Sequence, residues 1–325
     1  MRKNIWVVAH HQVTEIKPVT FELLNMADTL ARQIDANVNT LLLGTSVASL
    51  SSKLIGLCDH VYIFEHPLLE EYHYETYQQI FIKMAEKYRP DILLVSSILR
   101  GTDCFPRLAA HFNAHYVAGC LDLSFRPEEG LITYHQAVYE GRAILEGSFE
   151  LDRMAVIMTR PHVLTPSPEK KRKETKISLL GISLSPIEFL TRRVSSIKNV
   201  SISLGEALVV VAGGRGMQGA GGFKLLWELA RRLHGAVGAT KAAVDAGWCE
   251  HRFQIGQTGS LISPEIYIAC GISGSIHHLA GIQGAKTVIA INEDPEAPIF
   301  KRSDYGIVGN VFDVIPELIR EIDSL

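Results

Sequence analysis

Short apolar runs alternate with amphipathic stretches over the first half of the chain. In the stretch at 20–34, leucine and alanine recur every three or four positions, which is the spacing of one face of a helix. Alternation of strand and helix is typical of a parallel sheet with helices on both sides. The pattern predicts strands at 5–9, 38–43, 60–65, 91–96 and 154–159, with helices at 20–34, 71–87 and 104–112.

Shorter runs with alternating apolar and polar positions follow at 118–125, 131–138 and 142–149. Glycine and glutamate turns separate them, which favours an antiparallel addition to the sheet. The segment 161–195 then holds several prolines and little periodicity, so we expect a linker there. We therefore predict an N-terminal domain of residues 1–195, linker included, and a C-terminal domain from residue 196 to 325.

A second alternation of strand and helix begins near residue 207 and runs almost to the end of the chain. The expected elements are strands at 208–212, 265–269 and 287–291 and helices at 222–234, 273–282 and 311–322. The predicted fold class is thus α/β, with two domains that each hold a mainly parallel sheet flanked by helices. The C-terminal domain reads as Rossmann-like.

Composition and charge narrow the class of protein. Hydrophobic residues make up 47% and charged residues 21% of the 325 positions, the balance of a soluble globular protein. The net charge of −3 disfavours a nucleic-acid binder, and the basic cluster at 170–173 lacks interleaved aromatics, so we read it as part of a solvated linker. Five scattered cysteines predict reduced thiols in a cytoplasmic protein, without disulfides or a metal site. No apolar run approaches the ~20 residues of a membrane span.

A glycine-rich turn at 213–222 follows one predicted strand and opens a helix. Gly214, Gly216 and Gly219 formally satisfy the dinucleotide fingerprint G-x-G-x-x-G. That fingerprint also expects an acidic residue about 20 positions later, at the end of a second strand. Asp245 comes too late, and its neighbours do not look like a strand, so a nicotinamide site is a weak alternative. Arg215, inside the turn, is better explained as a cation aimed at an anionic ligand.

Two further segments bring polar groups to the same edge of the second sheet. The strand at 265–269 breaks at Gly271-Ile272-Ser273-Gly274 and restarts as a helix with His277 and His278 in its first turns, and the strand at 287–291 ends in Asn292. Open α/β sheets bind ligands at the carboxyl ends of their strands, so we predict a cofactor site here. The turn at 255–259 either lines this pocket or is an ordinary loop, and the sequence does not choose which histidine faces inward.

These residues resemble the alpha subunit of electron-transfer flavoproteins. The match covers nearly all of residues 205–325, whereas residues 1–190 fit the family's N-terminal domain in layout only. The matching motifs are, in order, Gly213-Gly214-Arg215-Gly216, 238–245, Gly256-Gln257-Thr258-Gly259, 265–274, His278-Leu279-Ala280-Gly281, 290–292, 294–300 and 304–308.

The resemblance implies a heterodimer with a beta subunit and an FAD held mainly by the C-terminal domain. Such proteins take electrons from flavin dehydrogenases, such as the acyl-CoA dehydrogenases of fatty acid beta-oxidation, and pass them on. The resemblance thus implies an electron carrier subunit rather than a self-contained enzyme. The cofactor-binding residues implied by position are Arg215, Thr240, Lys241, Ile255, Gly256, Gln257, Thr258, Ser273, Gly274, Ser275, Ile276, His277, His278, Asn292, Asn310 and Val311.

The resemblance also implies a role for several of these residues. Arg215 would lie over the isoalloxazine ring, Thr258 beside its N5 and His278 beside its C2 carbonyl. Ser273 and Gly274 would face the pyrophosphate and ribityl region, and Asn292 and Asn310 the adenosine. Arg215, Lys241, Thr258 and a protonated His278 would tune the flavin, since positive charge stabilises an anionic reduced ring.

Three positions depart from the family's usual pattern. His277 stands where Gln is usual, Thr240-Lys241 where Ser-Arg is usual, and Asn310 where Asp is usual. Lysine keeps the charge of arginine but loses its planar fork. We expect FAD still to bind, with an altered redox potential and semiquinone stability.

Other functions stay open at this point. A variant of the carrier is electron bifurcation, in which NADH is the donor and the beta subunit binds a second FAD. A nicotinamide-dependent dehydrogenase would use the Gly214–Gly219 turn, but it lacks the acidic ribose partner. A nucleotide-binding regulatory module on the N-terminal sheet is disfavoured, because that domain has no phosphate-cradling glycine loop.

Overall fold

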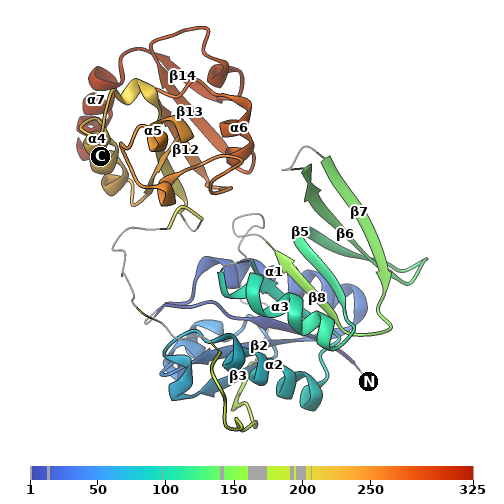
Figure 1. The fold of residues 1–325 in the computed structure, drawn as a ribbon. Helices are drawn as coiled ribbons and strands as arrows, with labels where there is room; N and C mark the ends of the chain where they lie inside the picture. Colours follow the sequence, from blue (N-terminus) through green and yellow to red (C-terminus); the bar gives the residue numbers. More distant parts are fainter. Residues whose placement is uncertain are drawn as a thin grey trace. The chain divides into compact units, whose positions relative to one another are not determined.

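The computed structural model shows two compact units, and the main part of each is continuous in sequence (Figure 1). The first comprises Met1–Val138 with Arg142–Ser196, and the second is formed mainly by Ile197–Leu325. The structure describes residues 2–12, 15–97, 99–139, 143–159, 174–190, 194, 203–205 and 207–324. Of the expected linker at 161–195, the parts at 161–173, 191–193 and 195 lie outside the described residues.

The first unit is built on one nine-stranded sheet with the strand order β7-β6-β5-β8-β4-β1-β2-β3-β9. In this order, pairing is parallel from β5 through to β9 and antiparallel between β5, β6 and β7; apart from the edge strand β9, this is the predicted arrangement. The strands are β1 (Lys3–Val8), β2 (Ala36–Gly44), β3 (His60–Glu65), β4 (Ile92–Ser96), β5 (His115–Arg126), β6 (Leu131–Val138), β7 (Ala143–Glu150), β8 (Ala155–Thr159) and β9 (Lys176–Leu179).

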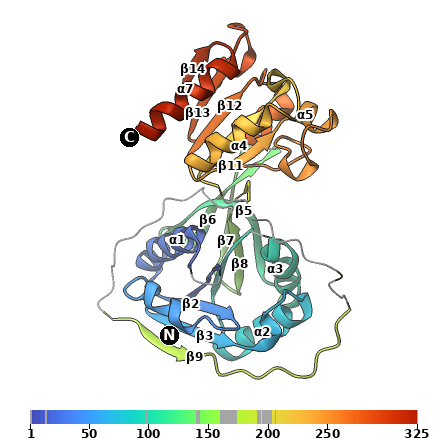
Figure 2. The same ribbon diagram turned by 90° about the vertical axis from the view of Figure 1, so that its left-hand side faces the viewer.

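Helices cover both faces of this sheet. In Figure 2, α1 (Pro18–Ile34) lies on one side of the strands, and α2 (Tyr74–Tyr88) and α3 (Leu99–His111) lie on the other. Successive residues of β1 accordingly enter different cores: Val7 packs beneath α1, whereas Trp6 packs beneath α2 and α3. Burial on both faces explains why the central strands read as continuous apolar runs.

The described part of the expected linker adds to the first unit. Its residues 176–179 form the edge strand β9, parallel to β3, which the sequence analysis did not predict. The chain then follows α2, where Lys83 donates to the carbonyl of Ser183 at 2.6 Å and the Gln79 side chain accepts from the Ser185 N–H at 2.6 Å. These hydrogen bonds involve polar groups at irregular spacing. The prediction relied on hydrophobic periodicity, which such contacts do not produce, so the course of this segment could not be predicted.

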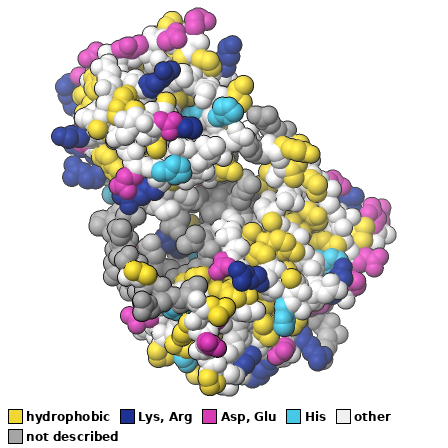
Figure 3. Space-filling view, viewed as in Figure 1, with side chains coloured by type: hydrophobic (Ala, Val, Ile, Leu, Met, Phe, Trp, Pro, Cys, Tyr) yellow, Lys and Arg dark blue, Asp and Glu magenta, His cyan; other side chains and the backbone are white. Residues whose placement is uncertain are grey.

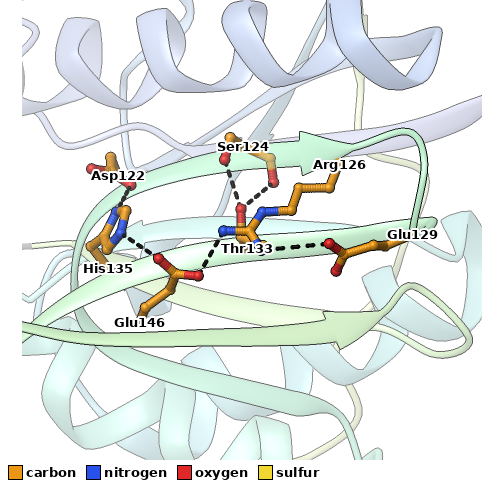
Figure 4. Close-up of polar contacts among 7 residues, drawn as sticks. All are labelled: Asp122, Ser124, Arg126, Glu129, Thr133, His135 and Glu146. Carbon is orange, nitrogen blue, oxygen red and sulfur yellow. Dashed lines mark hydrogen bonds and ion pairs between the residues drawn. The ribbon is translucent and has the colours of Figure 1, made fainter.

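The antiparallel extension carries a ladder of charged side chains on one face (Figure 4). His135 Nδ1 lies 2.7 Å from Asp122 Oδ1, and Arg126 Nη2 donates to Glu146 Oε1 at 2.6 Å. The hydrogen bond to Asp122, with help from Glu146, raises the pKa of His135 above its usual range. Such cross-strand pairs stabilise exposed antiparallel strands.

The second unit holds a wholly parallel five-stranded sheet with the order β11-β10-β12-β13-β14. Helices α4 and α7 pack on one face, where Leu226, Leu229 and Ile315 are fully buried. The strands are β10 (Val209–Gly213), β11 (Ala236–Ala239), β12 (Ile266–Cys270), β13 (Thr287–Asn292) and β14 (Tyr305–Val308), and the helices are α4 (Phe223–Arg232), α5 (Lys241–Asp245), α6 (Ile276–Leu279) and α7 (Val311–Ser324). Two α/β units with mainly parallel sheets confirm the predicted fold class.

The order of these strands fixes where a ligand can bind. From β10 the chain passes to β11 on one side and then returns to β12 on the other side. The loops that leave β10 and β12 therefore diverge, which opens a crevice at the carboxyl ends of the two strands. The second unit thus has a topological switch point at the end of β10, directly before the glycine-rich turn.

Candidate functional site

A cavity of about 530 Å³ lies at this switch point, within the range of small-molecule and cofactor sites. Loops that follow β10, β11, β12 and β13 form its walls, together with the segment 255–258. The lining residues are Gly214, Arg215, Gly216, Thr240, Lys241, Ala242, Asp245, Ile255, Gly256, Gln257, Thr258, Gly271, Ile272, Ser273, Gly274, Ser275, His277, His278, Asn292, Asp294 and Ala297.

Two of the wall loops touch backbone to backbone. The N–H of Gly214 donates to the carbonyl of Cys270, and the N–H of Gly216 to that of Gly271, both at 3.0 Å. A Cβ on Gly214 would lie 2.4 Å from the Gly271 oxygen, closer than any side chain tolerates. The glycine-rich turn is therefore needed for the approach of β10 and β12 loops, whichever ligand they hold.

The loop from Gly271 to Ser275 presents backbone donors to the cavity. The N–H groups of Ser273, Gly274 and Ser275 donate to no backbone carbonyl among the described residues. Gly274 has a φ of +85° and leaves no room for a Cβ beside the backbone of Ile299. Successive unpaired N–H groups in such a loop form an anion-binding concavity.

The helix after this loop is shorter than the sequence predicts. It begins at Ile276 rather than at residue 273, and after Leu279 it continues only as a 3₁₀ turn at Ala280–Ile282. A helix of one turn has little macrodipole, because the dipole is the sum of aligned peptide units. Donors for an anion in this wall therefore come from the N–H groups of the loop rather than from a helix N-terminus.

Two cations line the cavity, and they differ in their partners. Lys241 Nζ lies 2.5 Å from Asp245 Oδ2, one helical turn further along α5. Arg215 is exposed and has no acidic partner within the described part of the chain. A paired lysine offers a ligand little net charge, so Arg215 is the main source of positive potential in this wall.

Polar side chains without charge complete the walls. Thr240 Oγ1 is buried and has no hydrogen-bond partner among the described residues. The Thr258 hydroxyl accepts from the buried Gln254 amide at 3.0 Å, which leaves its own hydrogen free to donate. The Asn292 amide donates to the Ile272 carbonyl at 2.9 Å. A buried polar atom without a partner is costly unless something satisfies it, so Thr240 points to a ligand in the cavity.

The structure distinguishes the two adjacent histidines. His277 is exposed, and its Nδ1 donates to the Gln257 side chain at 2.5 Å, tying the start of α6 to the segment 255–259. His278 is buried, with Nε2 2.7 Å from the Tyr267 hydroxyl and Nδ1 3.1 Å from the Ile255 carbonyl. Burial lowers the pKa of His278 to about 4. The expectation of a protonated His278 therefore disagrees with its surroundings, because a buried charge without a counter-ion is unfavourable.

Most of the residues expected at the cofactor site line this one cavity. The turn at 255–259 belongs to it, through Ile255, Gly256, Gln257 and Thr258. Ile276, Asn310 and Val311 do not line it. Ile276 is 68% exposed, the Asn310 side chain accepts from the Phe312 N–H and caps α7, and Val311 packs into the core beneath α4.

Several lining residues are absent from the cofactor-binding residues that the sequence analysis gave, although it named some of them in other roles. They adjoin the cofactor-binding residues that it did give, so proximity to a strand end was the available signal. These residues are Gly214, Gly216, Ala242, Asp245, Gly271, Ile272, Asp294 and Ala297.

The structure also bears on the nicotinamide alternative. The second strand of the unit, β11, ends at Ala239, so the position of the ribose-binding acid is taken by Thr240. Asp245 lines the cavity, but it lies on α5 and pairs with Lys241. The acidic partner that the dinucleotide fingerprint requires is thus missing from the end of β11.

The described residues contain no group of three or more His, Cys, Asp or Glu side chains placed to hold a metal ion. Within the same residues, no helix has the length and apolar character that crossing a membrane requires. On the face drawn in Figure 3, basic and acidic side chains are interspersed rather than gathered into a stripe of one sign.

Comparison with known proteins gives matches over both units. The electron transfer flavoprotein domain matches residues 5–181, and the electron transfer flavoprotein FAD-binding domain matches residues 203–283. The chain is 37% identical to an electron transfer flavoprotein subunit alpha of Thermoanaerobacterium thermosaccharolyticum, with 99% of this chain and 98% of that protein covered. It is 36% identical to the corresponding subunit of Bacillus subtilis, over 100% and 99% of the two chains.

Two other relatives carry different names. A protein FixB of Clostridium saccharobutylicum is 35% identical, over 99% of this chain and 97% of that one. A lactate dehydrogenase (NAD(+),ferredoxin) subunit LctC of Acetobacterium woodii is 30% identical, over 99% and 77%. With a family domain over more than half its length and full-length relatives above 30% identity, the chain belongs to the electron transfer flavoprotein family, as an alpha subunit with an FAD-binding domain.

Proposed function

We propose that this alpha subunit binds its FAD in the 530 Å³ cavity and, paired with a beta subunit, carries electrons between flavin dehydrogenases and a downstream acceptor. The observation that carries the proposal is the cavity itself. It lies at the switch point of the sheet and gathers most of the expected cofactor residues from four strand-end loops and the segment 255–258. Scattered sequence positions converge in this way where a ligand is bound.

The chemistry of the walls suits FAD. The free N–H groups of Ser273, Gly274 and Ser275 are donors for the pyrophosphate, which needs several hydrogen bonds to an anion. Arg215 supplies the unpaired cation, and the Thr258 hydroxyl has a hydrogen to donate to a ring nitrogen. The orphaned Thr240 hydroxyl gains a partner when the cavity is filled. When bound, the flavin supplies reversible one- and two-electron transfer, while the protein positions it and sets its potential.

Asn310 and Val311 have a different place in the proposal. Asn310 donates to Glu293 at 2.5 Å while it caps α7, so it fixes the loop after β13 beside Asn292. We therefore assign both residues to the support of the adenosine end, with Asn292 as the contact residue. Ile276, which is exposed next to His277, remains a predicted contact of the cofactor.

The test is to copurify the chain with its beta partner and to measure the absorption spectrum and FAD content. We expect a yellow heterodimer whose flavin is lost when Arg215 and Thr258 are both replaced by alanine. The matched control replaces Lys301 and Ser303, which lie outside the cavity lining, by alanine and keeps the flavin. A colourless wild-type complex that takes up no FAD contradicts the proposal.

Electron bifurcation is a second candidate, favoured by one observation. The FixB and LctC relatives described above each match 99% of this chain, and the name of LctC includes both NAD and ferredoxin. In this variant NADH is the donor and the beta subunit holds a second FAD. Two FAD per heterodimer, one of them reduced by NADH, would establish the variant. One FAD that NADH does not reduce would exclude it.

A further inference from the structure

The imidazole of His278 is enclosed by protein groups on both of its nitrogen atoms. Tyr267, in the middle of β12, is 0% exposed, and its Oη lies 2.7 Å from His278 Nε2. On the other side, Nδ1 lies 3.1 Å from the Ile255 carbonyl oxygen. The histidine lines the cavity, whereas Tyr267 does not. A buried tyrosine outside the cavity thus determines how a residue of the cavity is held.

The partners fix the positions of the hydrogens. A backbone carbonyl only accepts, so the hydrogen on the His278–Ile255 contact belongs to Nδ1. Burial raises the pKa of Tyr267 well above its usual value, so the phenol keeps its hydrogen. With the phenol hydrogen directed to Nε2, both nitrogens are satisfied and the ring is neutral. In a protonated ring, Nε2–H would point at the same hydroxyl, whose own hydrogen would then need another acceptor inside the core.

We propose that Tyr267 is a positioning residue for His278: its hydroxyl donates to Nε2 and holds the imidazole as the neutral tautomer with hydrogen on Nδ1. The ring therefore meets a ligand in the cavity as an oriented but uncharged group. Any effect on a flavin rests on the proposed function, because the charge of His278 can influence a flavin ring only if one is bound in this cavity. Positive potential in the wall is then left to Arg215.

The tautomer is measurable without any cofactor. Long-range ¹H–¹⁵N spectra of the full chain labelled with ¹⁵N-histidine separate the protonated form and the two neutral tautomers. The His278→Gln variant identifies the signal of residue 278 among the 13 histidines. We expect the neutral pattern with hydrogen on Nδ1 at pH 7. A protonated ring, or hydrogen on Nε2, overturns the proposal.

The second measurement removes only the hydroxyl, with the variant Tyr267→Phe. We expect His278 to keep the hydrogen on Nδ1, which the Ile255 carbonyl still accepts, but to take up a second proton at a higher pH than in the unmodified protein, because Nε2 no longer accepts a hydrogen bond from the phenol. In the FAD-loaded heterodimer we expect reduction to become at least tenfold more favourable, since a ring freed from Tyr267 takes up a proton beside the reduced flavin. Tyr305→Phe, at an exposed residue of β14, is the matched control and leaves both the protonation of His278 and the potential unchanged.

The two readouts separate the possible failures. If Tyr267→Phe folds, as shown by an unchanged circular dichroism spectrum, and keeps both the pH at which His278 is protonated and the potential, the proposal is wrong. If the variant does not fold, the wild-type tautomer alone decides. If the wild-type heterodimer takes up no FAD, the proposed function fails, while the tautomer spectra still test the role of Tyr267.

Discussion

The contact between the glycine-rich turn and the β12 loop makes a sharp prediction for Gly214→Ala. The φ of Gly214 is −112°, which any residue adopts, so the substitution adds no backbone strain of its own. The added methyl would instead lie 2.4 Å from the Gly271 oxygen and 2.9 Å from the Ile272 Cα. The first contact is roughly 1 Å short of ordinary van der Waals distance. Both groups are backbone, so the clash is relieved only if the two loops separate.

The magnitude follows from overpacking and from the hydrogen bonds at risk. Forcing a methyl into a filled site costs about 1–3 kcal/mol. Loss of either bond, from Gly214 to Cys270 or from Gly216 to Gly271, is worth about 1 kcal/mol. The separated loops no longer present Arg215 and Ser273 together. Binding of FAD must bring them back together against the clash, so the cost of the clash reduces the free energy of FAD binding. We therefore expect the dissociation constant of FAD to rise by about five- to 150-fold.

The assay is FAD titration of the full chain, followed by the temperature at which flavin fluorescence appears on heating. Gly221→Ala is the control within the same turn, because a Cβ there meets nothing within 4 Å. We expect the control to bind FAD like the unmodified protein and Gly214→Ala to release it at a lower temperature. Equal affinity and equal release temperature for the two variants would refute the idea that this close approach builds the site.

Three further predictions concern charge and burial. Asp245→Asn should raise the flavin midpoint potential, because it leaves Lys241 without its 2.5 Å partner; an unchanged potential would place Lys241 away from the ring. The pKa of His135 is raised by its bond to Asp122, so this bond stabilises the fold fully below the unfolded pKa of 6.5, and the contribution is lost as pH rises through the folded pKa. The free energy of unfolding of His135→Asn, measured at pH 5.5 and 8.5, should be lower than that of the unmodified protein only at pH 5.5. Finally, Ellman's reagent should reach only the half-buried Cys249 in the native protein and all five thiols after denaturation, since the other four are buried.

Long apolar runs made most of the fold predictable. β3, for example, was predicted with the bounds that the structure shows. Strands of this kind are packed between helices on both faces of the sheet, so they consist mainly of apolar residues and can be recognised by that composition. The helix at 20–34 was equally clear, because one face of α1 is buried along its whole length. In both cases local pattern and tertiary packing agree, which is the condition under which sequence patterns are informative.

The short edge strands β9, β11 and β14 escaped prediction for physical reasons. Each has four residues. β11 consists of two alanines and a glycine around a single valine, and alanine and glycine are depleted in strands, while β9 and β14 are exposed along their whole length. Pairing with β3, β10 and β13 makes them strands, and such pairing is a property of the folded sheet rather than of the segment. The missing β11 also explains why the end of the second strand could not be located from sequence.

The cavity was predictable as a place but not as a charge distribution. Strand ends with glycine, hydroxyl and amide residues marked the edge of the sheet, and the structure brings them to one cavity. Which histidine turns inward depends on the register of α6, a helix too short to show a periodicity. Only the folded chain shows that His278 is enclosed by Tyr267 and Ile255, residues 11 and 23 positions away.

The contacts of Lys241 and His278 change how Lys241, which stands where the family usually has arginine, is interpreted. Judged by residue type alone, the cavity holds an arginine, a lysine and two histidines, which suggests a strongly positive site. The contacts in the structure change this picture: Lys241 is neutralised by Asp245, and His278 is neutral because it is buried between a phenol and a carbonyl. The positive potential at a ligand is therefore set by Arg215 and by backbone N–H groups. Lysine in place of the family's arginine then costs a planar hydrogen-bonding fork rather than a net charge, because either cation would lie one helical turn from the same aspartate.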